Sequence, residues 1–351
     1  MSAPILALQP LRVLTLTYPL APLSAAACGG CEQIAHQLVS GAGPGIEFYW
    51  LPAGISLPAH MNMVSDGERE AREHSANERA LEWLEKHPVD LIHVQGAPFF
   101  AVADRVSTPV LFTLHLARRL YPRGFLNCRP RHLHLQCVSQ TQTREYPDQP
   151  ICAVVPNGVD LRRFHARQEP GDADAPLLFL GRICPEKAPH LAIRLARAVR
   201  RRLHLVGEPG PFPYHAEYFR KEIAPQLDEQ IRHFPPPSVA GKLAFLRQAA
   251  AVVIPSQIEE TSSVVAMEAA ASGVPALGLR RGALPEVVAH GHTGFLADTW
   301  QNLAEYVSRL ASIAPQACRA HAEANFDGAR MVANYRSLYR RLTGRMAAHA
   351  G

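Results

Sequence analysis

Short apolar runs alternate with amphipathic stretches along the first 150 residues of the chain. Apolar and β-branched runs bounded by turn-forming residues predict strands at residues 12–17, 46–51, 90–95, 109–115 and 133–139. Helical periodicity predicts helices at residues 32–39 and 67–87. This alternation of strand and helix indicates a parallel sheet covered by helices on both faces.

The same pattern starts again in the second half. Strands are predicted at residues 177–180, 203–206, 251–255 and 274–277, and helices at residues 191–200, 264–271 and 325–341. A turn-rich segment at residues 155–160 and a loose stretch at residues 168–176 separate the halves. The chain of 351 residues is long enough for two such domains, with a boundary near residue 160.

Composition narrows the class of protein. Hydrophobic residues make up 47% and charged residues 19%, which excludes a wholly disordered chain. No apolar run reaches the ~18 residues of a membrane-spanning helix. The N-terminal segment has no positive charge ahead of its apolar stretch, so we expect a first buried strand there and a cytoplasmic protein.

The formal charge of +5 comes almost entirely from arginine, because lysine occurs only at positions 86, 187, 221 and 242. This balance suits anionic ligands or a membrane surface, and it lacks the clustering of a nucleic-acid binder. The seven cysteines are an odd number in mostly apolar segments, as in reduced, buried thiols. Cys28 and Cys31 form a C-x-x-C without a second ligand pair, so a redox or metal role is the less favoured alternative.

The segment from Gly181 to Lys187 is the first candidate ligand site. A predicted strand ends at Gly181, and Arg182 and Lys187 stand five residues apart in the loop that follows. Ligands of open α/β sheets bind at strand ends, and an arginine fork with a lysine suits a diphosphate. Taken alone, these residues would favour a solvated loop over a ligand site.

The second candidate is an E-x7-E segment from Glu260 to Glu268. A helix that starts near Ser262 or Ser263 would point its free N–H groups beyond the preceding strand and form an anion site. Carboxylates there suit sugar and ribose hydroxyls, although both could be surface charges. A third, glycine-rich stretch follows, with Gly273, Gly282, Glu286, Gly291 and Gly294.

In series, these three stretches resemble the donor domain of family 4 retaining glycosyltransferases of the GT-B fold. The family pattern has a G-R-x-x-x-x-K loop, E-x7-E, a glycine-proline strand, G-x-x-E and G-x-T-G, all present here in order. The first half resembles the family more loosely, through Gly29-Gly30-x-Glu32, Asp90-x-x-His93, Thr113-x-His115 and the segment at residues 155–160.

The resemblance implies two Rossmann-like doubly wound domains that face a central cleft. An acceptor domain would span residues 1–160 and a nucleotide-sugar donor domain residues 161–324. The helical segment at residues 325–351 would cross back to the first domain.

The resemblance also implies a role for each matching residue. Arg182 and Lys187 would bind the donor diphosphate, Glu260 the sugar hydroxyls, and Glu268 the ribose. Backbone N–H groups of Thr261, Ser262 and Ser263 would line the phosphates. His115 would lie near the sugar unless it is merely a packed strand-end residue, and Gly29, Gly30 and Gly181 would let loops approach the ligand.

The sequence departs from the family at several positions. Thr261-Ser262-Ser263 replaces the usual Pro-Phe-Gly, which leaves the identity of the donor sugar open. Ala188 stands where glycine often follows the lysine. The arginines from Arg118 to Arg131 would receive an anionic acceptor or contact a membrane surface, or form a solvated loop.

The expected activity is transfer of a sugar from a nucleoside-diphosphate sugar to a small-molecule, glycan or lipid-linked acceptor, with retention of configuration. Enzymes of this fold generally need no catalytic metal, so no cofactor is expected. A sugar-nucleotide epimerase, a phosphorylase and a non-catalytic sugar-nucleotide-binding protein remain alternatives. A dehydrogenase is disfavoured because no G-x-G-x-x-G follows the first strand.

Overall fold

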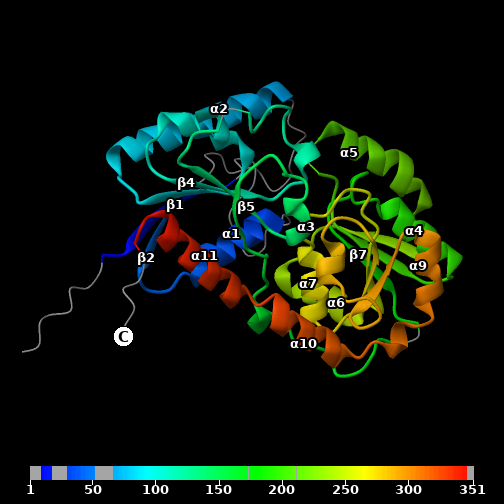
Figure 1. The fold of residues 1–351 in the computed structure, drawn as a ribbon. Coiled ribbons are helices and arrows are strands. Elements are labelled where there is room, and N and C mark those ends of the chain that lie inside the picture. The colour runs from blue at the N-terminus through cyan, green and yellow to red at the C-terminus, as the bar shows by residue number, and fades with distance from the viewer. Residues whose placement is uncertain are drawn as a thin grey trace, which may run out of the picture.

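Two parallel sheets organise the molecule (Figure 1). The structure is a computed structural model that describes residues 9–17, 30–51, 66–127, 129–172, 174–210 and 212–345. The first sheet has the order β2-β1-β3-β4-β5-β6. Its strands are β1 (Leu11–Leu16), β2 (Ile46–Trp50), β3 (Leu91–Val94), β4 (Val110–Leu114), β5 (Leu133–Cys137) and β6 (Ile151–Val154).

The second sheet has the order β12-β11-β10-β7-β8-β9, which is the order of a Rossmann fold. Its strands are β7 (Leu177–Leu180), β8 (Leu203–Val206), β9 (Ile231–Phe234), β10 (Ala251–Ile254), β11 (Ala276–Leu279) and β12 (Gly294–Ala297). The strand pairs described in both sheets are parallel, as the alternating pattern predicted.

Helices cover both faces of the first sheet. Helix α2 (Asp66–Lys86) and the 3₁₀ segment Ala97–Arg105 pack on one face, and α1 (Gly30–Gly41) and the C-terminal α11 (Gly328–Leu342) pack on the other. The short α3 (Gln140–Thr143) follows β5. The second domain contains α4 (Pro189–Ala198), α5 (Pro213–Tyr218), α6 (Val239–Gln248), α7 (Val264–Ala271), α8 (Leu284–Val287), α9 (Trp300–Val307) and α10 (Pro315–Asn325).

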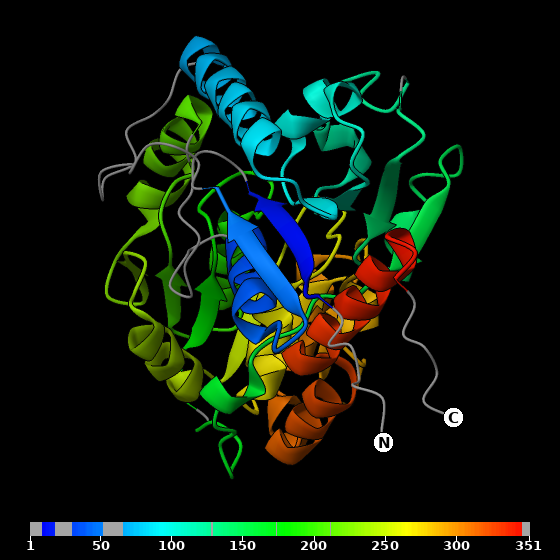
Figure 2. The ribbon, with the colours of Figure 1, turned by 90° about the vertical axis from the view of Figure 1, so that its left-hand side faces the viewer.

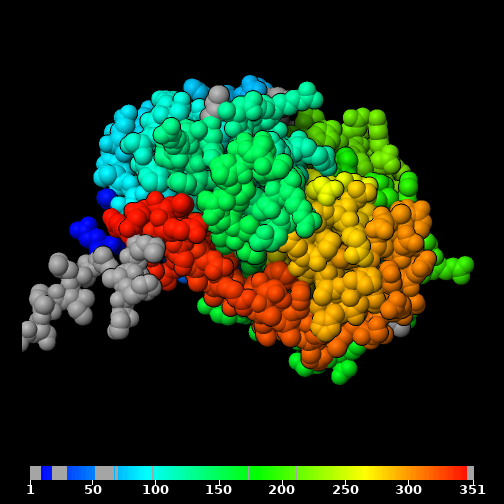
Figure 3. Space-filling view, viewed as in Figure 1, coloured from blue at the N-terminus to red at the C-terminus, as the bar shows by residue number. Residues whose placement is uncertain are grey.

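The chain passes between the sheets at two adjacent places. Val159, after β6, donates its N–H to the carbonyl of Phe326 (2.8 Å), and Gly328 donates to the carbonyl of Val159 (2.9 Å). From there α11 runs along the first sheet beside β1 and β2 (Figure 2), and its surface continues that of α10 across the molecule (Figure 3).

A buried polar network attaches α11 to the first sheet. The hydroxyl of Tyr339 lies 2.6 Å from His93 Nδ1, and His93 Nε2 lies 2.8 Å from Thr113 Oγ1. Tyr335 donates to Gln136 Oε1 (3.1 Å). Tyr335 and Tyr339, four residues apart on α11, therefore both face this sheet.

Several predicted elements have the observed bounds, including β7, β8 and α7. The terminal helix was predicted from residue 325, whereas α10 ends at Asn325 and α11 begins at Gly328. The break occurs because Asp327 caps α11, accepting a hydrogen bond from the Ala329 N–H.

Candidate active site

The candidate site lies at the point where the strand order of the second sheet reverses, between β7 and β10. Ligands of open α/β sheets bind beyond the carboxyl ends of such strands. Gly181 directly follows β7 with φ +155°, and a Cβ on Gly207, at the end of β8, would lie 1.9 Å from the Gly181 oxygen. This close approach brings the loop with Arg182 and Lys187 over the sheet edge.

Lys187 and Glu260 form an ion pair at this edge. Lys187 Nζ donates to Glu260 Oε1 at 2.6 Å, and the Ser256 hydroxyl donates to the same oxygen. The Glu260 side chain is 6% exposed and that of Lys187 is 31% exposed. The sequence pointed to both residues but assigned them to different parts of the ligand and did not indicate that they pair.

Gly282 supports the backbone of Glu260. It has φ +53°, and a Cβ there would lie 2.4 Å from both the nitrogen and the oxygen of Glu260. Its neighbour Ala283 donates to the Glu260 carbonyl (2.6 Å). The glycine-rich stretch therefore holds the Glu260 loop in place.

The N-terminus of α7 is open toward this site. Ser263 precedes the helix and its side chain makes no capping hydrogen bond in the described chain. The buried Ser262 Oγ has no hydrogen-bond partner among the described residues. An uncapped helix start carries free N–H groups and partial positive charge, so this place can bind an anion.

The first helix of the other domain meets α7 at this point. A Cβ on Gly30, which begins α1, would lie 3.4 Å from Val264 Cγ2 at the start of α7. Arg182 is exposed and makes no hydrogen bond or ion pair within the described ranges. Burial raises the pKa of Glu32, in the first turn of α1, while the charge of nearby Arg182 lowers it.

The predicted glycine and cysteine pairs of the first loop are only partly described. Gly29 and Cys28 lie outside the described residues, whereas Gly30 is the first residue of α1. Burial raises the pKa of the Cys31 thiol to about 12. Cys31 is therefore a protonated thiol near neutral pH, which disfavours the redox alternative for this residue.

His115 comes from the first domain and contacts the second. Its carbonyl accepts a hydrogen bond from the Thr261 hydroxyl (2.7 Å), and its Nε2 lies 2.6 Å from Gln95 Oε1. Burial lowers the pKa of His115 to about 4. The ring is thus neutral near pH 7, and the backbone of His115, through its carbonyl, contacts the Glu260 loop.

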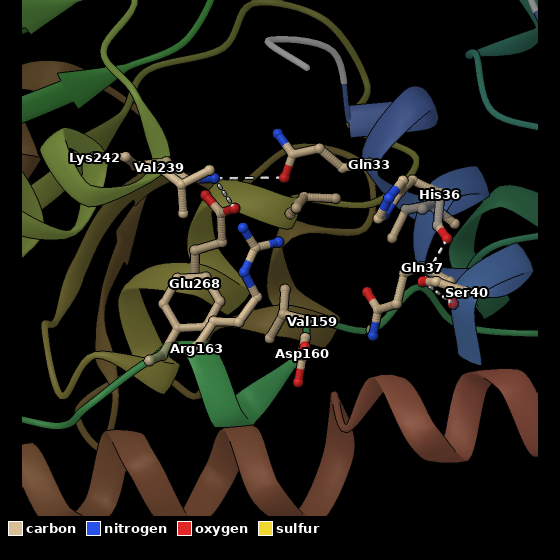
Figure 4. A pocket seen from close by; sticks show the side chains of 14 residues that line it. Gln33, His36, Gln37, Ser40, Val159, Asp160, Arg163, Val239, Lys242 and Glu268 are labelled. Carbon is tan, nitrogen blue, oxygen red and sulfur yellow. Dashed lines mark hydrogen bonds and ion pairs between the residues drawn. The ribbon is translucent and has the colours of Figure 1, made fainter. Parts of the chain in front are cut away.

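Glu268 faces a separate small pocket between the domains (Figure 4). Its carboxylate, 4% exposed, pairs with Lys242 of α6, whose Nζ also lies 3.4 Å from Gln33 Oε1 of α1. The pocket has a volume of about 70 Å³. The sequence analysis did not single out Lys242. The scarcity of lysine was a signal for it, because Lys187 and Lys242 are half of all lysines in the chain.

The arginine segment is less available than expected. Arg118 donates to Asp148 Oδ2 (2.8 Å), and its backbone N–H donates to Glu145 Oε2 (2.7 Å). Asp148 already pairs with Arg118, so an anionic acceptor would compete with that carboxylate for the guanidinium. Arg119 and Arg123 are exposed.

Solved structures define the class of fold. The chain is similar to AviGT4, a glycosyltransferase involved in avilamycin A biosynthesis, with a TM-score of 0.67 and 24% identity over 96% of this chain and 99% of that one. Alr3699/HepE of Anabaena, solved in complex with UDP-glucose, gives a TM-score of 0.70 and 17% identity over 93% of this chain and 100% of that one. The protein has the GT-B fold, as predicted.

Sequence comparison adds the family. Residues 175–312 match the family model described as Glycosyl transferases group 1. A D-inositol 3-phosphate glycosyltransferase of Pseudarthrobacter chlorophenolicus is 33% identical over 162 residues, 41% of this chain and 38% of that relative. The second domain is therefore similar to the group 1 glycosyl transferases, which confirms the resemblance that its motifs carry. The match spans about two fifths of the relative's length.

Among the helices of the described residues, none is long and apolar enough to cross a membrane.

Proposed function

We propose that this protein transfers a sugar from a nucleoside-diphosphate sugar to an acceptor, with retention of anomeric configuration, in the cytoplasm. One observation carries the proposal: the open N-terminus of α7, with the unpartnered Ser262 hydroxyl, adjoins the loop of the Lys187–Glu260 pair. Such a site suits a phosphate group linked to a polar sugar. The UDP-glucose complex of Alr3699/HepE supports the choice of ligand class.

The donor diphosphate would occupy the helix terminus. Breaking the glycosidic bond leaves negative charge on the departing nucleotide, so the largest electrostatic task is to stabilise that charge. Arg182, which has no partner within the described chain, and Lys187 are the cations for it. Because these two residues and the helix end supply positive charge, we propose that transfer needs no resident metal at this place.

The ion pair suggests how donor binding prepares Glu260. A diphosphate that attracts Lys187 would release the Glu260 carboxylate, which could then accept hydrogen bonds from sugar hydroxyls. Neutral His115 would add an uncharged polar group from the other domain. Thr261, Ser262 and Ser263 would donate backbone N–H groups to the phosphates.

Ribose binding by Glu268 requires a rearrangement. Ligand pockets usually measure ~300–1,000 Å³, whereas the pocket at Glu268 has about 70 Å³. The ribose would share Glu268 with Lys242, and α1 would move away from α6 to admit it. Exposed Arg119, Arg123 and Arg131 are cations for an anionic acceptor or a membrane surface.

Thermal-shift measurements with UDP, GDP, ADP and TDP test this proposal. A ligand at ~100 times its dissociation constant should stabilise the fold by roughly 2.7 kcal/mol. We expect at least one diphosphate to raise the melting temperature and NAD to leave it unchanged. The Lys187→Ala variant should lose most of that shift, and Lys221→Ala, which alters an exposed lysine paired with Glu217, should keep it. A folded protein that no diphosphate stabilises would refute the donor site.

A further inference from the structure

The loop between Arg182 and Lys187 also takes part in a second cluster of polar groups. Cys184 and Glu186 belong to this loop, and His215 belongs to α5 on the other side of it. The thiol sulfur, a carboxylate oxygen and a ring nitrogen all lie within 4.8 Å of one another. The proposed donor chemistry uses none of these three groups.

His215 has no ordinary partner for its ring. The residue is 1% exposed, and neither ring nitrogen makes a hydrogen bond of ordinary geometry with any residue that the structure describes. The Glu186 oxygen that faces it, Oε2, also has no hydrogen-bond partner among those residues, while Oε1 accepts from the Tyr214 hydroxyl (2.8 Å). Buried polar groups are almost always paired, so two unpaired groups that face each other require an explanation.

A simple histidine–carboxylate pair does not explain the arrangement. Nε2 of His215 and Oε2 of Glu186 are 3.5 Å apart, which is too long for a good hydrogen bond. Burial lowers the pKa of His215, which disfavours the charged ring that an ion pair would need. By contrast, two ligands bonded to one tetrahedral ion at ~2.0–2.3 Å stand about 3.3–3.8 Å apart.

We propose that Cys184, Glu186 and His215 bind a divalent transition-metal ion of the zinc class. Thiolate sulfur, imidazole nitrogen and carboxylate oxygen are the ligands that zinc takes in proteins. The thiolate and the carboxylate together neutralise the dication, so the bound ion adds no net charge beside the nearby Arg182. The other ring nitrogen, Nδ1, rests against Gly210, where a Cβ would lie only 2.3 Å from it, so the ring is held with Nε2 toward Glu186.

The ion would tie α5 to the loop that holds Arg182 and Lys187. The carbonyl of Glu186 also accepts from the Gln257 N–H (2.8 Å), which connects this loop to the one that carries Glu260. The site is therefore structural and positions the loop. It stands independently of the proposed function, since metal binding is measured without any nucleotide.

Equilibrium dialysis of the full-length, metal-stripped protein against Zn²⁺ tests the proposal. We expect about one tightly bound ion per chain in the wild type. Cys184→Ser and His215→Gln should each weaken binding by at least about tenfold. Glu186→Gln, which keeps an oxygen for the Tyr214 hydroxyl, should also weaken it while the chain stays folded. Cys318→Ser removes a buried thiol elsewhere and should leave binding unchanged.

Cobalt spectroscopy on the unmodified protein keeps the test decisive if a variant fails to fold. Stoichiometric Co²⁺ should produce thiolate-to-cobalt charge transfer and the intense visible bands of tetrahedral cobalt. The proposal is overturned if the wild type binds no stoichiometric Zn²⁺, if its cobalt complex lacks the thiolate band, or if folded Cys184→Ser binds Zn²⁺ as tightly as the wild type.

Discussion

At the scale of single residues, the contact between Lys187 and Glu260 governs the site. A carboxylate that is 6% exposed has lost most of its hydration, and the lysine 2.6 Å away compensates for that loss. The two groups hold each other in place beyond β7 and β10. A ligand that attracts one of them must therefore change the environment of the other.

This coupling predicts opposite effects for two substitutions. Lys187→Ala should weaken binding of the product nucleoside diphosphate about ten- to a hundredfold, because a charged hydrogen bond is worth ~1.5–3 kcal/mol. Glu260→Gln should leave that affinity unchanged or raise it, because Lys187 is no longer shared, and should still lower turnover by a similar factor. Isothermal titration measures both affinities, with Lys221→Ala as the control.

The opposite result has a clear meaning. Equal loss of nucleotide affinity in Glu260→Gln and Lys187→Ala would place the diphosphate, rather than the sugar, beside Glu260.

The backbone conformation of Ala188 explains why the family pattern often has glycine after the lysine. It precedes α4 with φ +49° and ψ +48°, in the left-handed region. That conformation costs a residue with a Cβ roughly 1–2 kcal/mol, and glycine avoids the cost. The glycine that often follows the lysine in the family pattern therefore meets a backbone requirement, and this chain bears the strain beside the loop of Arg182 and Lys187.

At the scale of elements, the packing of α11 on the first sheet depends on the buried side chain of His93. Burial lowers the pKa of His93 to about 3, against 6.5 for an ordinary histidine. Between these pH values the unfolded chain binds a proton that the folded chain does not. Stability is therefore lost as the pH falls from about 6.5 toward 3, by up to ~1.4 kcal/mol per pH unit, and this contribution is constant above that range.

The pH dependence of a His93 variant tests this account of α11. His93→Gln should be less stable than the wild type at pH 7.5, since Tyr339 and Thr113 lose their partner. The difference in thermal midpoint between the two proteins should narrow at pH 5, where only the wild type still has His93 to protonate. A difference in thermal midpoint that is the same at pH 7.5 and pH 5 would contradict the burial of a neutral His93.

The elements also show where sequence patterns stop being informative. The patterns located the central strands and the edge strand β2 well, but the other three edge strands, β6, β9 and β12, were not predicted. An edge strand has one neighbour and needs a less regular apolar pattern. The motifs predicted that Arg182, Lys187 and Glu260 lie at one edge of the sheet, because the carboxyl ends of parallel strands lie together. They could not pair Lys242 with Glu268, since that contact depends on how α6 packs against α7.

At the scale of the whole molecule, the site is shared by both domains. The Glu286 carboxylate of the second domain accepts backbone hydrogen bonds from Gln140 (3.0 Å) and Thr141 (2.5 Å) at the start of α3. The Thr261 hydroxyl of the second domain donates to the carbonyl of His115 in the first domain. These contacts, with the double crossing at Val159 and Gly328, hold the domains over the open end of α7.

The central claim is that the donor nucleotide binds at this shared site. The most direct measurement is a crystal structure with the nucleoside diphosphate that stabilises the protein most. We predict its diphosphate at the N-terminus of α7, within hydrogen-bond distance of Ser262, Ser263, Arg182 and Lys187. A nucleotide bound away from α7, or one that neither Arg182 nor Lys187 contacts, would contradict the account.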